Sequence, residues 1–223
     1  MKGKFIVALI ITIFVLGGCA MDNENESKSS SANEAKEFPE VAAFEDEFTR
    51  SFLESTETTR EGYYSFVSKS NSFKMDFPQD MIINEESHTV EPDDRGEYIY
   101  MEYNPEGSKD LYAVRTIQYT NFMTDEANSK KQISNSLDLE LEFNEISLNN
   151  DQKLQLADFE YDEEISGIAA LISNSKNQEL QIIADIQCGE STQSDTCTSK
   201  KEKEKEKIME WLETIEFINT EGR

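Results

Sequence analysis

Apolar residues recur in this chain at two spacings, and the spacing separates predicted helices from predicted strands. Large apolar residues after Pro39 follow one another at intervals of three or four positions: Val41, Phe44, Phe48 and Phe52. Side chains at this spacing share one face of a helix, so we expect a helix that faces the core. A second helix is predicted from Asp125, capped by Thr124, and a third over 200–216. The inward residues of the third helix are Ile208, Leu212 and Ile215, with Trp211 beside them.

Between these helices the apolar period is two, which is typical of strands. Alternation or a short apolar run predicts strands over 63–67, 73–77, 97–103, 111–119, 154–162, 165–173 and 179–188. Asn104-Pro105-Glu106-Gly107 has the composition of a turn and would join two of them in a hairpin. The apolar parity of 154–162 changes beside Ala157, so we expect a bulge or break there.

The order of elements is helix, strands, helix, strands, helix. The end of the second helix stays open, because four residues beyond its middle alternate like a strand: Leu137, Leu139, Leu141 and Phe143. Runs of strands flanked by helices indicate an α+β fold with a mostly antiparallel sheet, rather than a doubly wound parallel sheet. We expect one globular domain over 38–223, a size sufficient for a core of its own.

The first 37 residues follow another pattern. A basic tip, Met1-Lys2-Gly3-Lys4, precedes an apolar run of 12 residues, Phe5–Leu16. A membrane-spanning helix needs about 20 apolar residues, so this run predicts a secretory signal peptide over 1–18. Residues 19–37 are polar and poor in aromatic and β-branched residues, which predicts a flexible tether.

Leu16-Gly17-Gly18-Cys19 resembles the lipobox of bacterial lipoproteins. The resemblance implies that the chain is cut before Cys19 and that its sulfur receives a diacylglycerol group. Two acyl chains hold a protein stably on a bilayer, so the domain would be anchored at the extracytoplasmic face of the cell membrane. The alternative is an uncleaved anchor with an incidental cysteine.

Charge limits the classes of binding partner, and the cysteine content predicts a disulfide. The chain has 21 Lys and Arg against 46 Asp and Glu, a formal net charge of −25. Nucleic-acid binding needs clustered cations, so it is excluded. The acidity supports solubility, and it also suits cations, basic proteins or basic peptides as partners. With Cys19 lipidated, Cys188 and Cys197 are the two remaining cysteines, and outside the cytoplasm we expect them to form a disulfide.

Two segments resemble the PsbP-like α/β/α sandwich domains. Tyr64-Ser65-Phe66, followed by Ser72-Phe73-Lys74-Met75-Asp76-Phe77-Pro78-Gln79-Asp80-Met81, is similar to their opening, with Met81 in place of an aromatic residue. Trp211-Leu212-Glu213-Thr214-Ile215-Glu216-Phe217 is similar to the helix that ends them. The resemblance covers about 60–218. It implies a fold used by secreted accessory and assembly proteins, and it carries over no catalytic residue.

The inventory of reactive side chains is poor. His88 is the only histidine, and its polar surroundings favour a loop residue over a catalytic one. No G-x-S-x-G elbow, P-loop or G-x-G-x-x-G motif occurs. Three acids share a parity in one predicted strand and form the best candidate for a hard cation: Asp158, Glu160 and Asp162. A solvated strand face is the favoured interpretation of these acids.

Tyr98 and Tyr100 share one face of a predicted strand, opposite Ile99 and Met101. They are candidates for a binding surface if no helix covers them, although cover by a helix is the commoner outcome. We therefore expect a non-catalytic lipoprotein that binds or helps to assemble an envelope component, without a cofactor. The alternatives are a receptor for a small ligand or cation and, less favoured, a carboxylate-dependent hydrolase.

Overall fold

A computed structural model describes residues 38–103, 111–122, 124–148, 151–161, 165–189 and 194–218. These residues belong to one structural unit, Glu37–Arg223. The predictions for the signal peptide, the tether, Cys19, Asp162 and the 104–107 turn lie outside the described residues. Among the helices of the described part, none combines the length and the apolarity needed to cross a membrane.

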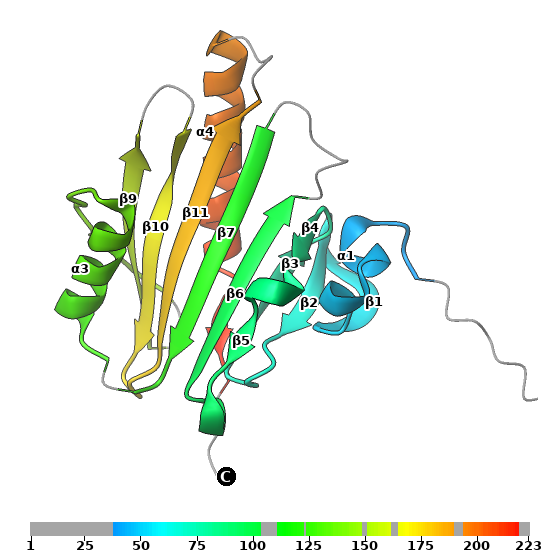
Figure 1. Cartoon of the computed structure of the whole chain (residues 1–223), viewed down its shortest axis with the longest axis horizontal. Coiled ribbons are helices and arrows are strands. Elements are labelled where there is room, and N and C mark those ends of the chain that lie inside the picture. Colours follow the sequence, from blue (N-terminus) through cyan, green and yellow to red (C-terminus); the bar gives the residue numbers. More distant parts are fainter. Residues whose placement is uncertain are drawn as a thin grey trace, which may run out of the picture. The chain divides into compact units, whose positions relative to one another are not determined.

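A large antiparallel sheet of eight strands forms the centre of the fold (Figure 1). Its order is β4 (Met81–Ile83), β6 (Gly96–Tyr103), β7 (Leu111–Thr120), β11 (Glu179–Cys188), β10 (Ile165–Asn174), β9 (Gln152–Glu160) and β8 (Asn144–Ser147), and β5 (Thr89–Val90) also pairs with β6. The prediction that 97–103 and 111–119 pair as an antiparallel hairpin is confirmed, because β6 and β7 are neighbours in register. The mostly antiparallel α+β class is confirmed with it.

A smaller sheet has the order β1 (Leu53–Arg60), β2 (Tyr63–Val67), β3 (Phe73–Pro78) and β12 (Glu216–Phe217). β1 was not predicted, because its sequence is polar and most of its residues are exposed. β12 also corrects the third helix: α4 spans Ser194–Leu212, and the chain then pairs with β3 as a strand.

The two faces of the large sheet are covered by different elements. On the inner face, Ile208, Trp211 and Leu212 of α4 share one apolar core with Phe66 and Phe73 of the smaller sheet. On the outer face, α3 (Glu126–Leu137) forms a second core with β9 and β10, made of Ile133, Leu137, Ala157, Phe159, Ala169 and Leu171. Figure 1 shows α4 behind the large sheet and α3 beside β9. The helices are therefore on opposite faces.

The predicted first helix is wrong as a single element. Two short helices replace it, α1 (Ala42–Glu45) and α2 (Glu47–Arg50), and Asp46 between them is extended. The Thr49 N–H donates to the Asp46 carboxylate over 2.7 Å, so the side chain caps α2 and interrupts the helix. Two 3₁₀ turns, η1 (Glu85–Ser87) and η2 (Pro92–Asp94), flank β5.

Two further expectations are corrected. No bulge occurs at Ala157, because β9 pairs with β10 without a register shift along its whole length. The face of β9 changes from apolar to acidic where Asp158 and Glu160 meet lysines in the first half of α4. The cap of α3 is Asp125 rather than Thr124, since its carboxylate accepts the Asn128 N–H over 2.9 Å. Leu139, Leu141 and Phe143 pack against the α3 core without forming a strand.

The cysteine pair joins a strand to a helix. Cys188, the last residue of β11, forms a disulfide with Cys197 near the start of α4, as the sequence predicts, and the two Cα atoms are 5.8 Å apart. Both residues are buried. The bond therefore fixes the beginning of α4 to the large sheet.

Candidate functional site

The acids proposed for a cation are paired with lysines instead. Lys205 Nζ lies 3.1 Å from Asp158 Oδ1, and Lys201 Nζ lies 3.9 Å from Glu160 Oε1. Asp162 lies outside the described residues. Within the part of the chain that the structure describes, no group of three His, Cys, Asp or Glu side chains is placed to hold a metal ion. The arrangement agrees with a strand face in ionic contact with α4.

Tyr98 and Tyr100 lie on the outer face of β6, while Ile99 and Met101 are buried on the inner face. Both tyrosines are half-buried, and α3 packs on β10 and β11 rather than over them. In Figure 1 neither α3 nor α4 lies in front of β6 and β7, and only the short 3₁₀ turn η1 lies against β6. Tyr112 of β7 is 37% exposed and donates to Glu102 Oε2 over 2.7 Å. Within the described residues, neither α3 nor α4 covers the predicted tyrosine stripe.

Two acids adjoin these tyrosines. The register places Glu102 beside Val114 and Val114 beside Asp185, so both acids share the outer face. Burial raises the pKa of the Asp185 carboxyl. Burial, followed by the charge of Asp185, raises the pKa of the half-exposed Tyr161. We call this surface the tyrosine face; it consists of Tyr98, Tyr100, Glu102, Tyr112 and Asp185.

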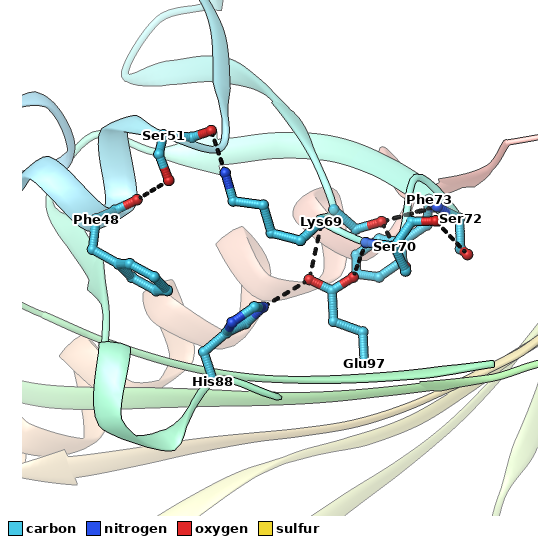
Figure 2. Close-up of polar contacts among 9 residues, drawn as sticks. Phe48, Ser51, Lys69, Ser70, Ser72, Phe73, His88 and Glu97 are labelled. Atoms are coloured by element: carbon cyan, nitrogen blue, oxygen red, sulfur yellow. Dashed lines mark hydrogen bonds and ion pairs between the residues drawn. The ribbon is translucent and has the colours of Figure 1, made fainter. Parts of the chain in front are cut away.

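A second group of polar residues surrounds Glu97, whose side chain is completely buried (Figure 2). Its Oε1 accepts the Lys69 N–H over 3.0 Å and lies 3.0 Å from His88 Nε2, and its Oε2 accepts the Ser70 N–H over 2.8 Å. We call these four residues the Glu97 cluster. Sequence reasoning missed Glu97, although its parity with Ile99 and Met101 places it on the core face.

His88 completes the Glu97 cluster and packs against two aromatic rings. Its ring lies edge-on to the rings of Phe48 and Phe52. Among the described residues, no hydroxyl group forms a hydrogen bond with His88, so the acid–histidine pair lacks a nucleophile. The cluster instead holds the β2–β3 turn against β6, which is a structural role.

A third group lies on the inner face around Arg115 of β7, which is 2% exposed. Arg115 Nη2 lies 3.2 Å from Glu204 Oε1 of α4, and Lys207 Nζ lies 3.3 Å from Glu204 Oε2. The guanidinium carbon lies 4.5 Å from the centroid of the Trp211 ring. Arg115 Nε and Nη1 have no hydrogen-bond partner within the described part of the chain. We call Arg115, Glu204, Lys207 and Tyr103 the Arg115 cluster.

The Arg115 cluster lines a half-open cavity of about 190 Å³. Other walls come from Tyr63 and Pro78 of the smaller sheet and from Asp80 before β4. Asp80 is exposed, but the cavity wall removes part of the water around its carboxyl group. This desolvation raises the pKa of Asp80, while the positive charges of Arg115 and Lys207 lower it. Burial, together with the charge of Glu204 and a hydrogen bond to it, raises the pKa of Tyr103. No motif pointed to this site, because its members are far apart in the sequence.

Comparison with known proteins gives the family of this two-sheet α+β domain. Residues 39–216 match the family described as "Putative lipoprotein YvcA", and the chain belongs to this family. A protein of Bacillus subtilis (strain 168) with the same description is 36% identical over 89 residues, which are 36% of this chain and 37% of that relative. The matching segment therefore spans well under two thirds of the relative. The prediction of a bacterial lipoprotein is confirmed, whereas the resemblance to PsbP-like domains stays a prediction.

Proposed function

We propose that this lipoprotein is a non-catalytic binding domain, held by lipid on Cys19 at the extracytoplasmic face of the cell membrane, which binds or helps to assemble a basic envelope protein. The observation that carries the proposal is the tyrosine face. Tyrosine contributes a large contact area at a low cost in conformational entropy and is therefore favoured at binding surfaces. Three tyrosines on neighbouring strands, over which neither α3 nor α4 packs in the described part of the chain, have this character.

The charge on the tyrosine face selects the chemistry of the partner. Glu102 and Asp185 lie among the tyrosines, and the whole chain has a formal net charge of −25. A partly desolvated carboxylate such as that of Asp185 gains from a cation placed beside it. Opposite charges also speed the encounter of two proteins. A segment rich in Lys and Arg is the partner that meets both requirements.

The anchor is tested separately from the partner. Cys19→Ser removes the sulfur that would carry the lipid, so the protein should leave the membrane fraction when cells are fractionated, whereas Cys188→Ser with Cys197→Ser should leave it membrane-bound. Full retention of the Cys19→Ser protein would contradict the anchor.

The partner is tested by photo-crosslinking the full-length protein in cells. A photoreactive residue at position 100 should give one recurrent protein adduct, and the peptide attached should be basic. The same residue at exposed position 203 on α4 is the matched control and should not give that adduct. Glu102→Lys with Asp185→Lys should abolish it, because the surface charge is reversed. Identical adducts from both positions, or an adduct that survives charge reversal, would contradict the proposal.

A second candidate function, a receptor for a small ligand, is favoured by the cavity at the Arg115 cluster. A carboxylate-dependent hydrolase has no such support among the described residues. The non-catalytic assignment therefore stays the proposal, and incubation with cell-wall fragments should release no product.

A further inference from the structure

We propose that the cavity beside Arg115 binds a small zwitterion of α-amino-acid size, with its carboxylate against Arg115 and Lys207 and its ammonium group against Asp80 and Glu61. This site lies on the inner face of the large sheet, whereas the tyrosine face lies on the outer face. The inference therefore goes beyond the proposed binding of an envelope protein and does not depend on it.

The first argument is unused hydrogen-bonding capacity at the cationic wall. A guanidinium group has five N–H donors. Arg115 is 2% exposed, yet two of its three nitrogens have no partner in the described part of the chain. A buried donor without an acceptor is unfavourable, so such a group calls for an acceptor that the protein itself does not supply. A carboxylate matches the planar fork of arginine better than any neutral acceptor does.

The second argument is that both carboxylate oxygens of Glu204 already have partners. One oxygen of Glu204 contacts Arg115, the other contacts Lys207, and the carboxylate also interacts with Tyr103. Two cations thus share one carboxylate. Asp80 also interacts electrostatically with both cations, but among the described residues Glu204 is the acid within ion-pair distance of them, so a ligand carboxylate would be a second acid in contact.

The third argument excludes a simple anion. Glu61 and Asp80 also line the cavity, and both are exposed. Desolvation raises the pKa of Asp80 although Arg115 and Lys207 oppose it, and a ligand ammonium group would oppose it further. A plain anion would meet the charge of these two acids, and a plain cation would meet Arg115 and Lys207. A molecule that carries both charges avoids both repulsions.

The walls and the volume limit the size of the ligand. About 190 Å³ corresponds to roughly six water molecules at their share of the liquid volume, which suits a molecule the size of an amino acid. Tyr63 and Pro78 offer apolar contact to the carbon atoms of such a ligand. Trp211 stacks on the guanidinium group and fixes its orientation, so that the carboxylate site is formed before binding.

The test measures binding of three probes, L-alanine, acetate and ethylammonium, to the full-length protein in detergent micelles by titration calorimetry. L-alanine should bind saturably, and the two probes with a single charge should bind about tenfold more weakly or not at all, since each lacks one charge-assisted contact. Equal binding of acetate and L-alanine, or no binding of L-alanine, would overturn the proposal.

Variants then locate the site. Lys207→Gln and Asp80→Asn should each weaken L-alanine binding about tenfold, because each removes one charged contact. Both residues have solvent-exposed side chains, so these variants should fold. The matched controls, Lys203→Gln and Asp93→Asn, change exposed residues away from the cavity lining and should bind as the wild type does. L-alanine binding that is unchanged in Lys207→Gln and in Asp80→Asn would overturn the assignment of the cavity.

Discussion

The Glu97 cluster and the Arg115 cluster are two buried charges on the same face of the large sheet, and their hydrogen bonding differs. Both oxygens of Glu97 are occupied, by two backbone N–H groups and by His88 (Figure 2). Arg115 has a single carboxylate partner, and two of its nitrogens have none within the described residues. Burial of a charge is common to both. The difference is that one group is satisfied by its own fold, while the other retains capacity beside a cavity.

This difference shows how a structural charge is distinguished from a candidate binding charge. A satisfied cluster stabilises one conformation, and nothing remains for a ligand to contact. An unsatisfied cluster is unfavourable in the free protein, and a ligand that supplies the missing acceptor removes that cost.

The largest effect is expected for Glu97→Gln. The amide keeps the shape of the side chain but places an N–H₂ group where Glu97 now accepts a hydrogen bond, and it removes the charge beside His88. The free energy of unfolding should fall by about 3 kcal/mol. Urea denaturation measures this change, and Glu86→Gln at an exposed position of η1 is the matched control. A loss below about 1 kcal/mol would mean that the cluster is not the closed structural unit that we describe.

The next effect concerns the disulfide, which holds the start of α4 and therefore the helix that carries Glu204 and Lys207. Replacing Cys188 and Cys197 by serine should lower the free energy of unfolding by about 2–3 kcal/mol in the chain-entropy model. Hydrogen exchange should quicken at the first turns of α4 and stay unchanged at the Ser70 N–H, which Glu97 holds. Equal acceleration at both places would show that the two clusters are not independent.

A smaller effect is expected for Arg115→Met. Glu204 keeps Lys207 and Tyr103 as partners, the two nitrogens without hydrogen-bond partners disappear, and methionine can pack on Trp211. The free energy of unfolding should therefore fall by only about 1 kcal/mol, clearly less than for Glu97→Gln. Urea denaturation of both variants under the same conditions makes the comparison. A decrease in the free energy of unfolding as large as that of Glu97→Gln would contradict the proposed difference between the two clusters.

The smallest effect is the pH dependence contributed by Asp80. Its pKa in the folded protein is raised above the ordinary value of 3.8. The folded state thus binds the proton more tightly than the unfolded state, and stability declines as the pH rises from about 3.8 through the raised pKa. Asp80→Asn does not titrate, so its Tm relative to wild type should increase between pH 4 and pH 7. A constant difference in Tm would contradict the raised pKa.

Much of the fold followed from local patterns. The period of two marked the central strands because each is long and has one face in a core; 179–188 coincides with β11. The parity of 97, 99 and 101 also indicates that Glu97 lies on the inner face. Other elements escaped prediction because their cause is not local. β1 is polar and is a strand through its pairing with β2, and Glu216 and Phe217 leave the helix to pair with β3.

The candidate sites likewise differ in how far they could be predicted from the sequence. Tyr98 and Tyr100 could be named from the sequence, because alternation assigns two residues of one strand to one face, but whether a helix covers them depends on where α3 packs. The Arg115 cluster could not be predicted, since Arg115 and Glu204 come together only when α4 crosses the sheet.

Local features of the chain were sufficient to predict a lipoprotein, an α+β fold and the pairing of Cys188 with Cys197. These are consequences of short motifs, of local apolar periods and of an inventory of three cysteines. Only tertiary packing shows that Asp158 and Glu160 are paired with lysines. It also shows that both oxygens of Glu97 have hydrogen-bond partners, whereas two nitrogens of Arg115 have none among the described residues. The physical reason is that hydrogen bonds and ion pairs depend on distances of about 3 Å, and only the packing of distant elements sets them.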